Sequence, residues 1–155
     1  VFLVMLAAAF ASDFVDGTVA RWSGGTTPFG AWLDSWADGA AYCAIALGVA
    51  LLWPRLVATE WLAFGALVAS FSLPAAVGWL RFRCLTAYHT WATKAAVATT
   101  AAALLTALFT GLGWPLRIAA GLALLAALEE ILITLLLTRP RSNVRGLWRL
   151  RRGAR

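Results

Sequence analysis

The chain has 155 residues, of which 62% are hydrophobic and 13% are charged, and its formal net charge is +6. Soluble domains carry about a quarter of their residues charged, so this composition excludes an ordinary soluble protein and favours a membrane protein. The cations lie at the ends of apolar segments, as in membrane proteins, and this placement argues against nucleic-acid binding.

The apolar residues form blocks of about 20 residues or more, the length that a helix needs to cross the hydrocarbon core of a bilayer. Turn-forming or basic stretches separate these blocks. The sequence therefore predicts an all-α integral membrane protein, a bundle of transmembrane helices. Five spans are expected, over residues 1–22, 30–53, 56–80, 89–111 and 115–137. Residues 1–138 would form one transmembrane domain, and residues 139–155 a basic cytoplasmic tail.

The distribution of lysine and arginine predicts the orientation of this bundle. All but two of the 13 Lys and Arg residues fall on one side of the five-span arrangement, and the exceptions are Arg55 and Arg117. Positively charged segments stay in the cytoplasm, so the 23–28 loop, the 81–88 connection and the tail are predicted to be cytoplasmic. Five spans would leave the N-terminus outside with no signal to export it. We therefore expect a further span before Val1.

Four of the seven acidic residues lie within 26 positions, on two predicted helix faces. The face of the first helix consists of Asp13, Asp16, Gly17 and Arg21. The face of the second helix consists of Gly30, Asp34 and Asp38. Ionisable residues are costly in or near hydrocarbon, so this grouping indicates a functional site.

Clustered carboxylates repel one another unless cations join them. An all-oxygen ligand set without His or Cys suits Mg²⁺ or Mn²⁺ and not zinc. Two such ions can clamp the attacking and leaving oxygens of a phosphoryl transfer. Arg21 offers a guanidinium fork suited to a diphosphate, and Gly17 lets a ligand approach the helix backbone. A polar helix pair that serves only packing is the alternative interpretation.

The segment from Asp13 to Asp38 reads DFVDGTVARWSGGTTPFGAWLDSWAD. At every fixed position it resembles the D-x2-D-G-x2-A-R-x8-G-x3-D-x3-D signature of the CDP-alcohol phosphotransferase family. The resemblance implies a homodimeric bacterial membrane enzyme with its site at the cytoplasmic face. Such an enzyme moves a substituted phosphate from a CDP-linked donor onto an alcohol and releases CMP. The family usually has six spans, so the resemblance also implies that the first family helix would precede Val1.

The resemblance also implies roles for the aspartates, the glycines and the arginine of the signature. Two divalent cations, Mg²⁺ or Mn²⁺, would be held by Asp13, Asp16, Asp34 and Asp38. Asp38 would in addition be the catalytic base that accepts the proton of the acceptor hydroxyl. The CDP moiety would be bound by Asp13, Gly17, Arg21 and Gly30.

The acceptor is less well specified by the sequence. The expected pocket for its phosphate, or for the phosphate of the donor lipid, consists of Arg81, Arg83, His89 and Lys94. Membrane anchoring by positive charge would equally explain Arg81 and Arg83. We expect CDP-diacylglycerol as the donor and glycerol 3-phosphate as the first candidate acceptor. Inositol phosphate, serine and a second lipid stay open.

Two alternatives to an active enzyme stay open, a truncated inactive homologue and a cation-binding membrane protein such as a small carrier. Arg21 argues against the carrier, because a cation pathway gains nothing from a guanidinium among its ligands. Glu129 and Glu130 lie inside the fifth predicted span, and at least one of them is expected to face the bundle or a dimer contact.

The charge distribution yields a test of the orientation. We introduce Thr86→Cys or Ser142→Cys into a chain that lacks Cys43 and Cys84. Each new cysteine should resist a membrane-impermeant thiol reagent added to intact cells, and should react once the membrane is permeabilised. Rapid labelling of either position from outside would contradict the predicted orientation.

Overall fold

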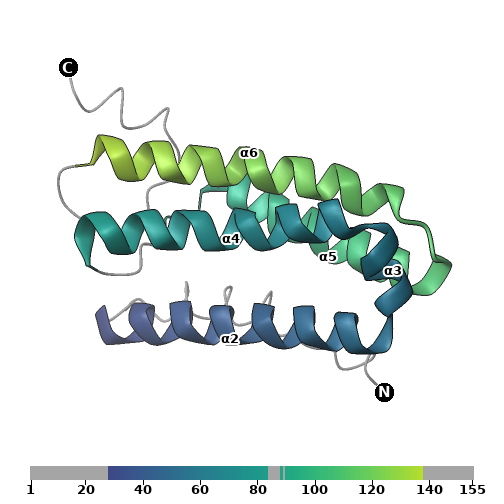
Figure 1. Ribbon diagram of the computed structural model, residues 1–155. Coiled ribbons are helices and arrows are strands. Elements are labelled where there is room, and N and C mark those ends of the chain that lie inside the picture. The colour runs from purple at the N-terminus through teal and green to yellow at the C-terminus, as the bar shows by residue number, and fades with distance from the viewer. Residues whose placement is uncertain (1–27, 84–87, 89, 138–155) are drawn as a thin grey trace. The chain divides into compact units, whose positions relative to one another are not determined.

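The computed structural model describes residues 28–83, 88 and 90–137 (Figure 1). Every regular element in that part of the chain is an α-helix. The helices are α2 (Pro28–Leu52), α3 (Pro54–Thr59), α4 (Trp61–Phe82), α5 (Trp91–Thr110) and α6 (Trp114–Leu136). The prediction of an all-α membrane bundle is confirmed. The first expected span and the tail lie outside the described residues.

The chain divides into two compact units, Val1–Pro54 and Arg55–Arg155. The second unit contains α4, α5 and α6, and each of these helices is long and apolar enough to cross a membrane. The spans predicted over 89–111 and 115–137 are therefore confirmed as α5 and α6. In the first unit, α2 contains a shorter apolar stretch, Gly39–Leu52.

Prolines fix both ends of α2. Pro28 occupies its first position, where the missing N–H removes no helical hydrogen bond. At its end, the Trp53 N–H donates to the Val49 carbonyl oxygen at 2.8 Å. The next residue, Pro54, cannot donate a further bond, so the helix ends there. The helix predicted over 30–53 is confirmed with these bounds.

The span predicted over 56–80 is wrong at its start, because two helices occupy this region. α3 ends at Thr59, and α4 begins at Trp61 and runs on to Phe82. Between them Glu60 adopts φ −110° and ψ 28°, outside the helical range. The Glu60 side chain does not cap α4. It is held instead by Arg117 of α6, a contact between distant residues that hydropathy does not reveal.

Helix α6 packs against both α4 and α5. Its buried face is rich in alanine, and one core cluster joins Ala96 of α5 to Ala123 and Ala126 of α6, with Leu67 of α4 beside them. Small side chains let helix backbones approach closely, which is how helices associate in lipid. Large apolar residues such as Leu125 and Leu136 lie exposed on the outer surface, as expected for lipid contact.

The end of the unit where α4 and α6 begin is joined by an ion pair, and we call it the Arg117 end. Arg117 donates from Nε to Glu60 Oε2 and from Nη2 to Glu60 Oε1, both at 2.8 Å. The Glu60 side chain is only 8% exposed, against 68% for Arg117. The hydrogen bonds from Arg117, aided by its charge, hold the pKa of Glu60 below its usual range despite the opposing effect of burial.

Gly113, directly before α6, makes room for this pair. A Cβ at Gly113 would overlap the Glu60 carboxylate and would lie 2.7 Å from the Glu60 Cγ. The residue has φ −86°, a value open to any amino acid, so the requirement for glycine is steric. The ion pair and Gly113 together hold the start of α4 against the start of α6.

Gly113→Ala should lower the unfolding free energy of the detergent-solubilised protein by roughly 1–3 kcal/mol, as at other overpacked sites. The added methyl would displace Glu60 from Arg117. Gly121→Ala on α6 is the matched control, since nothing lies within 4 Å of its added methyl. Because alanine favours a helix more than glycine does, Gly121→Ala should leave the unfolding free energy unchanged or raise it. Equal thermal stability of the two variants would contradict the steric role of Gly113.

Candidate active site

The described part of the aspartate signature lies on α2. Gly30, Asp34 and Asp38 occupy positions four residues apart on this continuous helix. With 3.6 residues per turn, this spacing keeps the three positions on one face, and each step advances about 6 Å along the axis. Asp34 and Asp38 are therefore about one helical turn apart, on the same face of α2 as Gly30.

The other residues of the signature lie outside the described residues, and these are Asp13, Asp16, Gly17 and Arg21. Within the described ranges, no group of three or more His, Cys, Asp or Glu residues could hold a metal ion. The complete set of four aspartates offers only carboxylate oxygens, and this donor chemistry fits hard divalent cations. Its assignment as a metal site stays a prediction.

The predicted acceptor residues in the described part of the chain lie where α4 ends and α5 begins, which we call the Tyr88 end. Arg81 donates from Nε and Nη2 to the Leu137 carbonyl oxygen, at 3.4 and 3.2 Å. Arg83 closes α4 in the left-handed conformation, with φ 55°. His89 lies outside the described residues.

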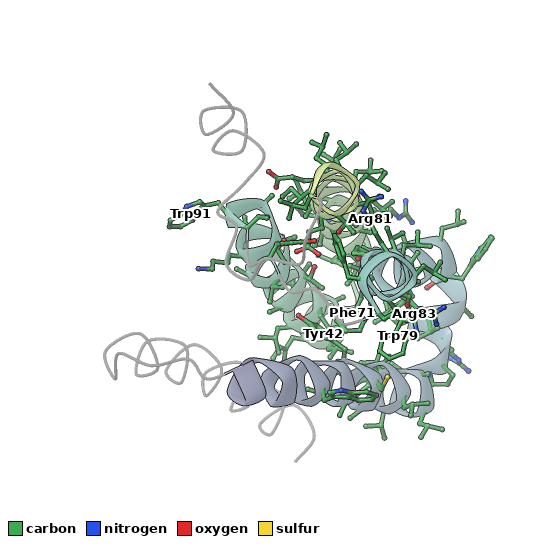
Figure 2. All side chains as sticks on the ribbon, turned by 90° about the vertical axis from the view of Figure 1, so that its left-hand side faces the viewer. Tyr42, Phe71, Trp79, Arg81, Arg83 and Trp91 are labelled. Atoms are coloured by element: carbon green, nitrogen blue, oxygen red, sulfur yellow. The ribbon has the colours of Figure 1, made fainter. Side chains whose placement is uncertain are left out.

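Lys94 lies on the first turn of α5, with its Nζ 5.5 Å from the centroid of the Trp91 ring. Trp91 is 73% exposed, and Figure 2 shows it projecting away from the helices, while Arg81 lies between α4 and α6. The structure thus brings Arg81, Arg83 and Lys94 to the same end of the unit. In the described part of the chain, no hydrogen bond links the side chains of these three cations to one another.

The Tyr88 end also contains a polar cluster, much of which sequence reasoning missed. It consists of Tyr88, Thr90, Thr93, Glu130 and Thr134. The Thr93 hydroxyl donates to Glu130 Oε1 at 2.7 Å, so the expectation that one of the two glutamates faces the bundle is confirmed for Glu130. Polar residues at the start of one apolar segment and near the end of the next are a signal that could have found this cluster.

Tyr88 and Thr134 are both fully buried in this cluster, with 1% and 0% of their surfaces exposed. Their hydroxyl oxygens lie 3.1 Å apart, and the Thr134 hydroxyl also bonds the Glu130 carbonyl oxygen at 2.9 Å. The Tyr88 ring packs in an apolar cluster with Ile133 and Leu137. The connection between α4 and α5 is therefore anchored on the last turns of α6.

Of the predicted site residues that the structure describes in the second unit, none lies at the Arg117 end. The crevice beside its ion pair, about 330 Å³, is lined by residues 59–63 and Arg117. The candidate site residues that the structure describes thus lie on α2 and at the Tyr88 end.

The family of this chain is identified by comparison with known protein families. The sequence matches the CDP-alcohol phosphatidyltransferase family over residues 1–138. The protein belongs to this family. The match includes the whole aspartate signature and all the described helices, so the predicted resemblance is confirmed. Neither a curated protein nor a solved structure matches the chain.

Family membership gives the general activity of this CDP-alcohol phosphatidyltransferase. It is a membrane transferase of phospholipid biosynthesis that takes a CDP-linked lipid donor and an alcohol acceptor. The three long apolar helices of the second unit agree with a membrane setting.

Proposed function

We propose that this protein transfers the phosphatidyl group of CDP-diacylglycerol to glycerol 3-phosphate and depends on divalent cations. The observation that carries the proposal is the complete aspartate signature, Asp13 to Asp38, inside a family match that covers residues 1–138. The acceptor oxygen forms a bond to the β-phosphorus of the donor. The bond from that phosphorus to the bridging oxygen breaks, and CMP leaves with the electron pair.

In this proposal, Asp38 accepts the proton of the acceptor hydroxyl. It is the last carboxylate of the signature, on the same face of α2 as Gly30 and Asp34. Asp13, Asp16, Asp34 and Asp38 would hold two cations, Mg²⁺ or Mn²⁺, because all four supply carboxylate oxygens. When bound, these ions would neutralise the diphosphate and lower the pKa of the acceptor hydroxyl.

The remaining residues of the signature bind the donor. Arg21 donates to the diphosphate through its planar guanidinium, which suits phosphate oxygens. Gly17 and Gly30 carry no side chain, so the CDP moiety can approach the helix backbone there. Asp13 contributes to the same CDP site.

The phosphate of the acceptor would bind the basic residues Arg81, Arg83, His89 and Lys94. The grouping of Arg81, Arg83 and Lys94 at the Tyr88 end supports this assignment. Glycerol 3-phosphate is favoured over serine because its phosphate is an anion that suits several cations. Inositol phosphate fits the same argument and is the nearest competitor.

The charge distribution supports a site on the cytoplasmic side of the membrane, and we place the enzyme in a bacterial cell membrane. We further propose that the enzyme is a homodimer.

The proposed metal site predicts a strict dependence on divalent cations. Activity of purified protein in detergent should vanish in EDTA and return when Mg²⁺ or Mn²⁺ is added in excess. Zn²⁺ should restore it poorly, because the ligand set has no His or Cys. Full turnover in chelator would contradict the metal-dependent mechanism.

The proposed base predicts the behaviour of Asp38→Asn, which keeps the shape and one ligand oxygen but removes the proton acceptor. Turnover should fall roughly a hundredfold or more, the usual contribution of general base catalysis, while CDP-diacylglycerol binding is largely kept. CMP release and donor binding are measured separately at saturating Mg²⁺.

Asp16→Asn is the matched comparison, because it changes a ligand that is not the proposed base. It should weaken metal and donor binding together. If Asp38→Asn turns over normally, or loses donor binding as severely as Asp16→Asn, the base is another residue.

A further inference from the structure

The large buried side chains of α5, Leu104 and Leu108, lie in the second half of the helix, whereas its interface with α6 near the Tyr88 end consists of small side chains. The core cluster of this interface joins Ala96 of α5 to Ala123 and Ala126 of α6, and further alanines of both helices are buried. Alanine side chains are short and do not interlock as large side chains do. Neighbouring axial registers of such an interface therefore differ little in packing, and a directional contact is needed to select one.

The Thr93–Glu130 hydrogen bond is such a contact. The Thr93 hydroxyl donates to the side-chain oxygen Oε1 of Glu130 at 2.7 Å and so joins the first turn of α5 to α6. An ionisable side chain inside a membrane-spanning helix is costly, and an apolar residue would serve packing alone. Glu130 is half-buried, and the best-attested use of a polar group between packed helices is to fix register.

The same contact is continuous with the N-terminus of α5. Thr90 is fully buried, and its hydroxyl oxygen accepts the Thr93 N–H at 3.1 Å, so that it caps the helix. The Thr90 and Thr93 hydroxyls lie 3.0 Å apart. Since the Thr93 proton goes to Glu130, the Thr90 hydroxyl donates to Thr93 Oγ1. The Glu130 carboxylate thus holds the start of α5 through two hydroxyls.

At this end α4 is also held in place relative to α6, because Arg81 donates to the Leu137 carbonyl oxygen. The positions of Arg83, which closes α4, and Lys94, on the first turn of α5, are therefore both set against α6. These are two of the proposed acceptor-binding cations. A shift of α5 along α6 would change the separation between them.

We propose that Glu130 is a positioning residue for the acceptor. By holding Thr93 it sets the axial position of α5 relative to α6, and this position sets the spacing of the cations that bind the acceptor. The inference rests on the proposed function of those cations. It assigns to Glu130 and Thr93 an effect on acceptor affinity, without contact to the reacting atoms.

The kinetic test compares Thr93→Val with Thr99→Val in the full chain. Both changes remove a hydroxyl from α5 and keep the side-chain shape, but the Thr99 hydroxyl bonds only carbonyls of its own helix, Ala95 and Ala96. Thr93→Val should raise KM for glycerol 3-phosphate up to roughly tenfold, the effect of losing one hydrogen bond. Its kcat and its KM for CDP-diacylglycerol should stay at the values of Thr99→Val.

Thr93→Ser restores the hydroxyl and should restore the acceptor KM. A purely structural role would instead lower the amount of active enzyme without changing that KM. The inference is overturned if Thr93→Val matches Thr99→Val in acceptor KM, or if its two KM values rise together.

A second measurement does not depend on activity. Ala96→Cys and Ala126→Cys are combined in a chain that lacks Cys43 and Cys84, since both alanines belong to one buried cluster. The yield of the oxidised α5–α6 crosslink should fall when Thr93→Val is added and should stay unchanged with Thr99→Val. An unchanged yield overturns the inference even if the enzyme is inactive. Absence of CMP release from the unaltered chain would count against the proposed function alone.

Discussion

Helix α6 contacts both α4 and α5, and the alanines on its buried face let the three backbones come close together. Lipid is as apolar as these side chains, so burial alone gives little reason for one arrangement over another. The specific contacts are polar and lie at the two ends of α6. At the Arg117 end, Glu60 receives two hydrogen bonds from Arg117. At the Tyr88 end, the Thr93 hydroxyl donates to Glu130, and Arg81 donates to the carbonyl oxygen of Leu137, directly after α6.

The sequence predicted the helices well, because lengths of apolar sequence and turn residues are local signals. α2, α5 and α6 lie within two residues of their expected bounds at all six ends. The error at the start of α4 has a non-local cause, since Glu60 pairs with a residue 57 positions away. Hydropathy gives no partner for a single glutamate. The steric role of Gly113 depends on the same pair and was equally hidden.

The candidate site likewise has one part that the local sequence reveals and one part that depends on long-range packing. The aspartate signature is a fixed spacing of charged residues within 26 positions, so it could be found from sequence and agrees with the family match. The polar cluster at the Tyr88 end joins residues 37 to 46 positions apart, on segments with no shared motif. Only the packing of α5 on α6 brings these residues together. In the proposed acceptor site, the positions of the cations depend on such long-range contacts, and spacing in the sequence does not encode them.

The central claim is transfer of a phosphatidyl group from a CDP-linked lipid to an alcohol. It is tested most directly by supplying membranes that contain the chain with CDP-diacylglycerol labelled in both its cytidine and its acyl chains. The account predicts that CMP release requires an added alcohol, that the acyl label moves into a new phospholipid in equal amount, and that glycerol 3-phosphate is the best acceptor of a panel. No CMP release with any alcohol, or release without a new phospholipid, would contradict it.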